Sequence, residues 1–300
     1  TSNISSSTNN KIIAHFFCLF SKSNLLKIKL KMIKTKILEK NLTLAESPIF
    51  CNRSNKLYWV DIKKKIVFNF DLKSKKKNKY NFTDIPSAVF LTANPKWIGI
   101  VTNKNILITN FKKKLILTKL KLRKKVRTND SKIDKNGNLV FSTMQENKKN
   151  KGAIFKFIFK KDKIKLLFKN LTIPNSISFN KKNFYFSDSA KGIIYKNDKK
   201  NYMINSHLIE PDGATITQDN KIIFADYKNA ELKIVYNNKI LDKIKLPCKN
   251  PTSLCFFGKK LNYICVTSHN NKNKKKNKYD GSVFTFKSDL IGKIENFADV

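Results

Sequence analysis

Six polar residues recur in this chain at intervals of 37 to 45 residues, and four of them carry oxygen atoms suited to binding a metal ion. The six positions are Glu46, Ser87, Asp130, Asn175, Asp212 and Thr252. Carboxylate and amide oxygens, without sulfur or imidazole, favour calcium, magnesium or manganese. If the repeats bring these positions together, Glu46, Asp130, Asn175 and Asp212 would form an oxygen-rich cation site.

A purely structural role is the alternative for each of these residues. Asn, Asp and Ser at the start of a strand often cap turns by hydrogen-bonding to nearby backbone groups. That role is the simpler explanation of any one position taken alone. Four acceptor residues in register across six repeats favour a shared site, because carboxylates crowded together repel unless they are protonated or bind a cation.

The elements that position these residues are short strands. Residues 46–71, 175–198 and 212–236 follow one plan, in which strands alternate with turns rich in Asn, Lys and Asp. No segment has a sustained helical period. A repeat of about forty residues, with three visible strands and a more variable fourth, predicts an all-β, six-bladed β-propeller with a metal site at the mouth of its central channel.

The propeller is predicted to occupy residues 32–300 as a single domain, and residues 1–31 are expected to be a disordered or non-native extension. A ring of blades must also close. Residues 33–38 have strand character, and we expect them to form the outer strand of the last blade. The inner strands of that blade are predicted within residues 252–257, 262–268 and 281–286.

The net charge of +41 does not predict a specific nucleic-acid partner, because only three arginines contribute to it. Arginine is the residue that binds phosphates in a forked geometry. The lysines are spread along the chain with abundant Asn, Ile and Phe, as an AT-rich genome would produce. No apolar run approaches the roughly 18 residues that span a membrane. Five cysteines without Cys-x-x-Cys spacing indicate free thiols and a cytoplasmic location.

Several stretches of the chain resemble the senescence marker protein/gluconolactonase/luciferin-regenerating family, which includes regucalcin. They run in family order and comprise LAESPIF and KLYWVDI (44–62), VRTNDSKIDKNGNLVFSTM (126–144), TIPNSISF and FYFSDS (172–189), PDGATITQDNKIIFADY (211–227), and LPCKNPTSLCFFG and YICVTS (246–268). The resemblance implies a six-bladed propeller that hydrolyses sugar lactones such as gluconolactone.

The resemblance also implies one divalent metal, Ca²⁺ or Zn²⁺, with Mg²⁺ and Mn²⁺ as further candidates. Its ligands would be Glu46, Asn175 and Asp212. The expected reaction is attack of a metal-activated water on the lactone carbonyl. Asp212 is the catalytic residue that we expect to take the proton from this water.

Substrate-binding roles fall on the third repeat. Arg127 and Asn129 match family positions that contact the substrate, and Glu146 matches an acidic position there, with Asn147 as the alternative alignment. Asp130 is expected to orient this region. Ser131 and Ser176 depart from the family, which usually has glycine at both positions, so a slightly shifted backbone is expected at the mouth.

Three other functions remain open at this point. One is a non-enzymatic calcium-binding or regulatory propeller, and another is a propeller that binds proteins or polyanions through its lysines. The third is a related hydrolase that acts on lactones or esters other than sugar lactones. For the lactonase, the expected partner is a small-molecule sugar lactone, with no specific nucleic acid and no membrane, and the protein is expected to be a monomer or weak oligomer.

Overall fold

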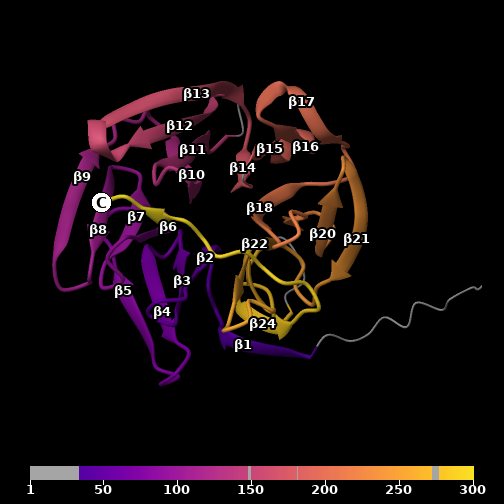
Figure 1. Cartoon of the computed structure of the whole chain (residues 1–300), viewed down its shortest axis with the longest axis horizontal. Helices are drawn as coiled ribbons and strands as arrows, with labels where there is room; N and C mark the ends of the chain where they lie inside the picture. The colour runs from indigo at the N-terminus through magenta and orange to yellow at the C-terminus, as the bar shows by residue number, and fades with distance from the viewer. Residues whose placement is uncertain (1–33, 148–149, 181, 272–276) are drawn as a thin grey trace, which may run out of the picture. The chain divides into compact units, whose positions relative to one another are not determined.

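The computed structural model describes residues 34–147, 150–180, 182–271 and 277–300. They lie in one compact unit, Lys34–Val300. The predicted extension, residues 1–31, lies outside the described residues. Within the unit, six antiparallel sheets surround a common axis (Figure 1). The prediction of an all-β, six-bladed propeller is confirmed.

The strands of each blade follow one another outward from the axis. Blade 1 comprises β2 (Ala45–Cys51), β3 (Lys56–Asp61), β4 (Ile66–Asp71) and β5 (Lys77–Asn81). Blade 2 comprises β6 (Pro86–Thr92), β7 (Ile98–Thr102), β8 (Asn105–Thr109) and β9 (Lys114–Lys119), with β25 (Phe297–Ala298) added beside β6. Blade 3 comprises β10 (Val126–Ile133), β11 (Leu139–Gln145), β12 (Gly152–Ile158) and β13 (Lys163–Leu171).

The second half of the ring has the same plan. Blade 4 comprises β14 (Pro174–Phe179), β15 (Phe184–Asp188), β16 (Ile193–Lys196) and β17 (Asp198–Asn205). Blade 5 comprises β18 (Pro211–Ile216), β19 (Ile222–Asp226), β20 (Glu231–Tyr236) and β21 (Lys239–Lys245). Blade 6 comprises β22 (Pro251–Phe257), β23 (Tyr263–Ser268), β24 (Val283–Lys287) and β1 (Thr35–Glu39).

Helical structure in the described part of the chain is limited to two single turns, η1 (Phe159–Lys161) and η2 (Ser189–Lys191). Among the described residues, no helix has the length and apolar character needed to cross a membrane. The four cysteines in these residues are free and buried, as expected: Cys51, Cys248, Cys255 and Cys265.

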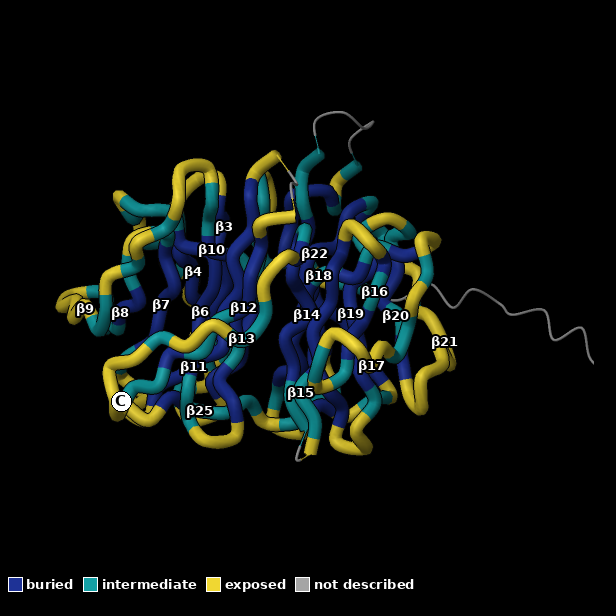
Figure 2. Tube along the Cα trace, turned by 90° about the horizontal axis from the view of Figure 1, so that it is seen from above, coloured by how far each residue is buried: buried dark blue, intermediate teal, exposed yellow. Residues whose placement is uncertain are grey.

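Burial falls from the axis to the rim of the propeller. All seven residues of β6 and of β22 are buried, whereas most residues of the outer strand β21 are exposed (Figure 2). Apolar side chains fill the spaces between neighbouring blades, as in the cluster of blades 1 and 6 around Trp59, Phe50 and Phe257. Each blade therefore buries both faces of its sheet only because it has a neighbour on each side.

The innermost strands form a closed circle. Each contacts the next in the order β2, β6, β10, β14, β18 and β22, and β22 returns to β2. The ring closes through β1, which pairs antiparallel with β24 with Thr35 opposite Phe286. The expectation that residues 33–38 supply the outer strand of the last blade is confirmed for the described part of that segment.

A C-terminal strap, residues 291–300, crosses the end of the channel at which the innermost strands finish, on the near side in Figure 1. It binds several blades in turn. Its hydrogen bonds include Gly292 N to Leu261 O (2.8 Å), Lys293 N to Ile216 O (3.3 Å) and Asn296 Nδ2 to Ile133 O (2.9 Å). β25 then lies parallel to β6. The strap ties together blades that are distant in sequence.

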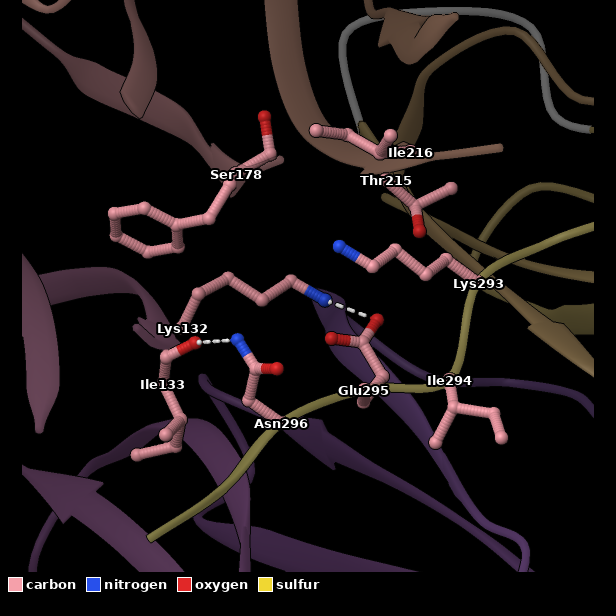
Figure 3. Close-up of a pocket in the computed structure, with 10 residues that line it drawn as sticks. Lys132, Ile133, Ser178, Thr215, Ile216, Lys293, Ile294, Glu295 and Asn296 are labelled. Atoms are coloured by element: carbon pink, nitrogen blue, oxygen red, sulfur yellow. Dashed lines mark hydrogen bonds and ion pairs between the residues drawn. The ribbon is translucent and has the colours of Figure 1, made fainter. Parts of the chain in front are cut away.

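An ion pair anchors the strap inside the channel. Lys132 Nζ lies 2.7 Å from Glu295 Oε1, and the two side chains are only 13% and 19% exposed (Figure 3). Burial acts to lower the pKa of Lys132, but the charge of Glu295 and its hydrogen bond raise that pKa above its ordinary value. Lys132 is therefore a buried cation whose charge Glu295 balances.

Breaking this pair is expected to destabilise the fold. In Glu295→Gln, Lys132 keeps its charge without the carboxylate partner, and the free energy of unfolding should fall by about 3 kcal/mol. Urea unfolding followed by tryptophan fluorescence measures this. The matched control is Asp299→Asn in the same strap, whose partner Lys160 is exposed, and it should change stability little. Equal stability of the two variants would contradict the anchoring role of Glu295.

Candidate functional site

A β-bulge at the start of the innermost strand is common to all six blades. In each blade the pairing of the first and second strands shifts register, between Glu46 and Ile49 in blade 1 and between Asn175 and Ser178 in blade 4. The other shifts lie at Pro86/Ala88, Thr128/Ser131, Pro211/Ala214 and Pro251/Ser253. Bulges re-aim side chains and recur next to functional sites. Here they contain or adjoin the six recurring polar residues.

Two serines adopt left-handed backbone conformations in these bulges, with φ of 51° at Ser47 and 54° at Ser176. This conformation favours glycine, which is the residue that the family resemblance led us to expect at Ser176. Both serines bond to the next blade instead. Ser47 Oγ accepts from Val89 N (3.0 Å), and Ser176 Oγ donates to the carbonyl oxygen of Asp212. Ser176 thus links two of the predicted metal-ligand strands.

A chain of side-chain hydrogen bonds joins the predicted substrate residues to a predicted metal ligand. Arg127 Nη1 donates to Asn129 Oδ1 at 2.8 Å. Asn129 Nδ2 donates to Asn175 Oδ1 at 2.6 Å, and Asn175 Nδ2 donates to Ser189 Oγ at 2.9 Å. Each amide is held by a partner at both its oxygen and its nitrogen. Asn175 therefore directs its oxygen, and not its NH₂ group, towards Asn129.

The predicted carboxyl groups interact electrostatically. Burial, followed by the charge of Asp130, raises the pKa of Glu46 to about 8. Burial, together with the charges of Glu46 and Asp130, raises the pKa of Asp212 well above its ordinary value. Burial lowers the pKa of Arg127, while the charges of Glu46, Asp212 and Glu146 oppose that effect. The structure therefore brings the predicted metal and substrate residues into one electrostatically coupled group.

Asp130 has a distinct position in this group. Its Oδ2 accepts from Ile177 N at 2.8 Å, so its carboxylate bridges from blade 3 to the strand that carries Asn175. Burial raises the pKa of Asp130 to about 6, although this hydrogen bond acts in the opposite direction. The orienting role expected for Asp130 stays a prediction.

The donor set fits a hard divalent cation. Glu46 and Asp212 are carboxyl groups whose pKa values are raised by burial and by the charges of neighbouring carboxylates, and a bound cation would offset both effects. Asn175 adds a neutral oxygen, which has a second lone pair beyond the one that Asn129 uses. In the described part of the chain, no three His, Cys, Asp or Glu residues are grouped to hold a metal. The predicted ligand set contains only two such residues, Glu46 and Asp212, and depends on the amide oxygen of Asn175 for its third ligand.

The sequence of residues 44–270 matches the family model described as SMP-30/Gluconolactonase/LRE-like region. The chain belongs to this family. Regucalcin from Homo sapiens is 26% identical over 255 residues, which cover 77% of this chain and 85% of that protein. Regucalcin from Gallus gallus is 25% identical over 249 residues, covering 75% and 83% respectively.

Solved structures of the family share the fold. A luciferin-regenerating enzyme superposes with a TM-score of 0.80 at 20% identity and covers 89% of this chain and 100% of its own. A regucalcin from Agrobacterium tumefaciens, described as a calcium-binding protein, gives a TM-score of 0.82 at 18% identity, with 89% and 98% covered. A gluconolactonase from Xanthomonas campestris gives 0.67 at 12% identity, with 87% and 91% covered.

Three buried aspartates, which we call the clamp aspartates, were missed by the sequence analysis. Asp61, Asp188 and Asp226 end the second strands of blades 1, 4 and 5, the blades that carry the predicted metal ligands, and all three are fully buried. Each accepts hydrogen bonds from backbone just before the first strand of its own blade. These bonds run from Thr43 and Leu44 to Asp61 (2.8 and 3.2 Å), from Thr172 and Ile173 to Asp188 (2.9 and 3.1 Å), and from Glu210 to Asp226 (3.1 Å).

The clamp aspartates therefore fix the backbone that leads into each predicted ligand. The second strands of blades 2, 3 and 6 end instead in Thr102, Gln145 and Ser268. The signal was present in the sequence, because the second strands of these three blades end in WVD, FSD and FAD. Aligning the second strands as well as the first would have found it.

Cation binding at the mouth should weaken as pH falls. Since the pKa of Glu46 is about 8 in the metal-free protein, an incoming cation must displace a proton below that pH. Calorimetric titration with Ca²⁺ should give a dissociation constant at least roughly tenfold larger near pH 6 than near pH 8. In Glu46→Gln, binding should be weaker and less dependent on pH. Binding to the unmodified protein that is equally tight at both pH values would contradict this electrostatic description.

Removing the charge of one clamp aspartate should weaken cation binding without touching a ligand. Asp188→Asn replaces an acceptor oxygen by an NH₂ group facing backbone donors. We expect a loss of about 2 kcal/mol in the free energy of unfolding and roughly tenfold weaker Ca²⁺ binding. The control is Asp198→Asn, a partly exposed aspartate at the start of the outer strand β17 that also accepts from two backbone amides. Its Ca²⁺ affinity should match that of the unmodified protein; unchanged affinity in Asp188→Asn would contradict the clamp.

Proposed function

We propose that this protein is a divalent-metal-dependent hydrolase that opens sugar lactones. The observation that carries the proposal is the hydrogen-bond chain from Arg127 through Asn129 to Asn175, coupled electrostatically to Glu46 and Asp212. It joins a group suited to binding hydroxyls with an oxygen-rich cation site. Membership of a family named for gluconolactonase, and the fold shared with a gluconolactonase, support lactone chemistry.

The metal would be held by Glu46, Asn175 and Asp212. When bound, it supplies a Lewis acid for the lactone carbonyl and lowers the pKa of water at the site. The all-oxygen donor set favours Ca²⁺, with Mg²⁺ and Mn²⁺ as alternatives of the same ligand preference. Zn²⁺ is the further candidate that the family resemblance implies.

Asp212 is the proposed general base. Lactone opening requires a proton to leave the attacking water and a proton to reach the alkoxide of the opened ring. A carboxylate at the site can accept this proton and return it. Asp212 suits this role because it interacts electrostatically with both Glu46 and Arg127. Its backbone carbonyl is fixed by Ser176, so its position is set from the neighbouring blade.

Arg127 and Asn129 would hold the substrate. Arg127 Nη1 donates to the Thr128 carbonyl (3.0 Å) and to Asn129, which fixes the plane of the guanidinium. A guanidinium in a fixed orientation binds neighbouring oxygens with defined geometry. Glu146 directly follows β11, is exposed, and acts electrostatically on Arg127. It would accept from a substrate hydroxyl at the rim.

The second candidate is a calcium-binding protein without hydrolytic activity. The Agrobacterium tumefaciens regucalcin, described as calcium-binding, favours it. Both functions use the same cation site, so they differ only in whether bound metal leads to turnover. The buried free cysteines favour a reducing, cytoplasmic location for either one.

The proposal predicts hydrolysis of gluconolactone and of five-carbon aldonolactones only when a divalent ion is present. Proton release in a weakly buffered pH-indicator assay, with Ca²⁺, Mg²⁺, Mn²⁺ or Zn²⁺ added in turn, measures it. Asp212→Asn should lower kcat by at least about 100-fold, because it removes both the base and a ligand. Glu46→Gln should raise the metal concentration needed for activity.

The control is Asp219→Asn, an exposed aspartate on the same blade, which should retain the activity of the unmodified protein. If the protein binds Ca²⁺ but opens none of these lactones faster than buffer with any of the four ions, the lactonase proposal is wrong and the calcium-binding function is favoured. Activity that survives chelation would exclude the metal-dependent mechanism.

A further inference from the structure

The residue after the second strand of each blade forms a second ring at the channel mouth. Second strands run antiparallel to first strands, so each ends where a first strand begins, as Pro174 pairs with Asp188 and Pro211 with Asp226. The residues that follow these strands around the ring are Ile62, Asn103, Glu146, Ser189, Tyr227 and His269. This outer ring surrounds the starts of the first strands, which carry the candidate ligands.

Three members of the outer ring already serve the site described above. Asn103 Oδ1 accepts from the backbone N and from Oγ1 of Thr128, beside Arg127 (3.0 and 3.1 Å). Ser189 Oγ accepts from Asn175. Glu146 is the proposed acceptor for a substrate hydroxyl. Tyr227 on blade 5 and His269 on blade 6 occupy equivalent positions and have no role in the mechanism.

These two aromatic residues form a fixed pair. The Tyr227 hydroxyl lies 2.6 Å from His269 Nδ1, and the ring centroids are 6.0 Å apart. Their backbones are held as well. Tyr227 N donates to Glu210 O, His269 N donates to Asn250 O, and Asn250 Nδ2 donates to Tyr227 O at 2.9 Å. Both rings are therefore placed by the blades themselves and not by a mobile loop.

The Tyr227 hydroxyl has a second partner besides His269. The side chain of Asn271 hydrogen-bonds to it and acts to lower its pKa. Burial, followed by the charge of Lys63, lowers the pKa of His269, which favours the neutral imidazole. A neutral imidazole has one donor and one acceptor nitrogen, and Nδ1 is the one that pairs with the hydroxyl.

Tyr227 also interacts electrostatically with residues of the candidate metal site. Burial is the largest cause of its raised pKa, and the charges of Asp212, Glu210 and Glu46 add to it. Blade 6, with His269, is three blades from blade 3, with Arg127, and so stands across the mouth from it. The pair and Arg127 therefore lie on different sides of the channel mouth.

We propose that Tyr227 and His269 form a second wall of the substrate site, which binds the hydroxyl-bearing carbons of an aldonolactone while Arg127 binds from the opposite side. The inference rests on the proposed lactonase function and deepens it. The tyrosine ring offers an apolar face to the C–H groups of a sugar ring, and its hydroxyl and the imidazole Nε2 offer polar contacts to substrate hydroxyls. His269 is the positioning residue, because its Nδ1 holds the Tyr227 hydroxyl at 2.6 Å.

A site that hydrogen-bonds to substrate hydroxyls discriminates against substrates that lack them, because its polar groups are then left unpaired. Tyr227→Phe keeps the ring and removes the hydroxyl. We therefore expect kcat/KM for gluconolactone to fall roughly tenfold, mainly through a higher KM. For the unsubstituted six-membered lactone, the same variant should match the unmodified protein. His269→Phe should show the same selective loss.

The experiment compares both lactones on the unmodified protein, Tyr227→Phe, His269→Phe and the control Tyr236→Phe, all with the divalent ion that supports the fastest turnover. Tyr236 is 40% exposed at the end of β20, and its variant should not differ from the unmodified protein. Binding of gluconate, the expected product, is measured by calorimetry on the same four proteins, with Ca²⁺ if no ion supports turnover.

The outcomes separate this inference from the proposed function. Hydrolysis by the unmodified protein that Tyr227→Phe and His269→Phe leave unchanged would overturn the second wall and keep the lactonase. Equal losses on both lactones would also overturn it, because they indicate general damage to the site. If the unmodified protein does not hydrolyse lactones but binds gluconate, and both variants weaken that binding, the second wall stands and the lactonase fails. If the unmodified protein shows no hydrolysis and no gluconate binding, both proposals are wrong.

Discussion

Closure of the ring is the constraint on which the rest of the structure depends. The six innermost strands contact one another in a circle, and β1, the first described strand, completes the last blade of that circle by pairing with β24 near the other end of the chain. The candidate ligands Glu46 and Asp212 lie on blades 1 and 5, and blade 6 separates them. Without β1 beside β24, blade 6 would lack its outer strand and the two carboxyl groups would have no reason to share a site.

The channel mouth combines irregular backbone with interacting charges. All six blades interrupt their strand pairing there with bulges, two serines adopt left-handed conformations, and partly buried carboxyl groups have raised pKa values. Irregular backbone together with charged groups of shifted pKa is typical of functional sites. The clamp aspartates and the bonds from Ser47, Ser176 and Asp130 to neighbouring blades hold the mouth in this state.

Much of this architecture could be predicted from the sequence, because it rests on repeated residue types. The recurring polar residues located the first strand of every blade, and apolar runs located its partners. The bulges could not be predicted, since a register shift depends on backbone pairing and leaves no mark in residue type. The strap was missed for a related reason: β25 has two residues, Phe297 and Ala298, and its segment shows no alternation.

Contacts between blades also escaped the sequence analysis. Tyr227 and His269 are 42 residues apart, and no sequence motif contains both of them. Only the common position after the second strand relates them. Glu146 was found at the same position because the family resemblance marked it. The clamp aspartates differ from these cases, since their recurrence was visible in the printed sequence and was overlooked.

The pairing of β1 with β24 also determines when the protein can finish folding during synthesis. Residues 35–39 leave the ribosome early, whereas their partners, residues 283–287, emerge after five blades are already made. Until then, the apolar flank of blade 1 around Phe50 and Trp59 has no neighbour to cover it. A nascent chain of this kind exposes an aggregation-prone apolar surface for most of its translation. It must be kept from premature association until its last blade arrives.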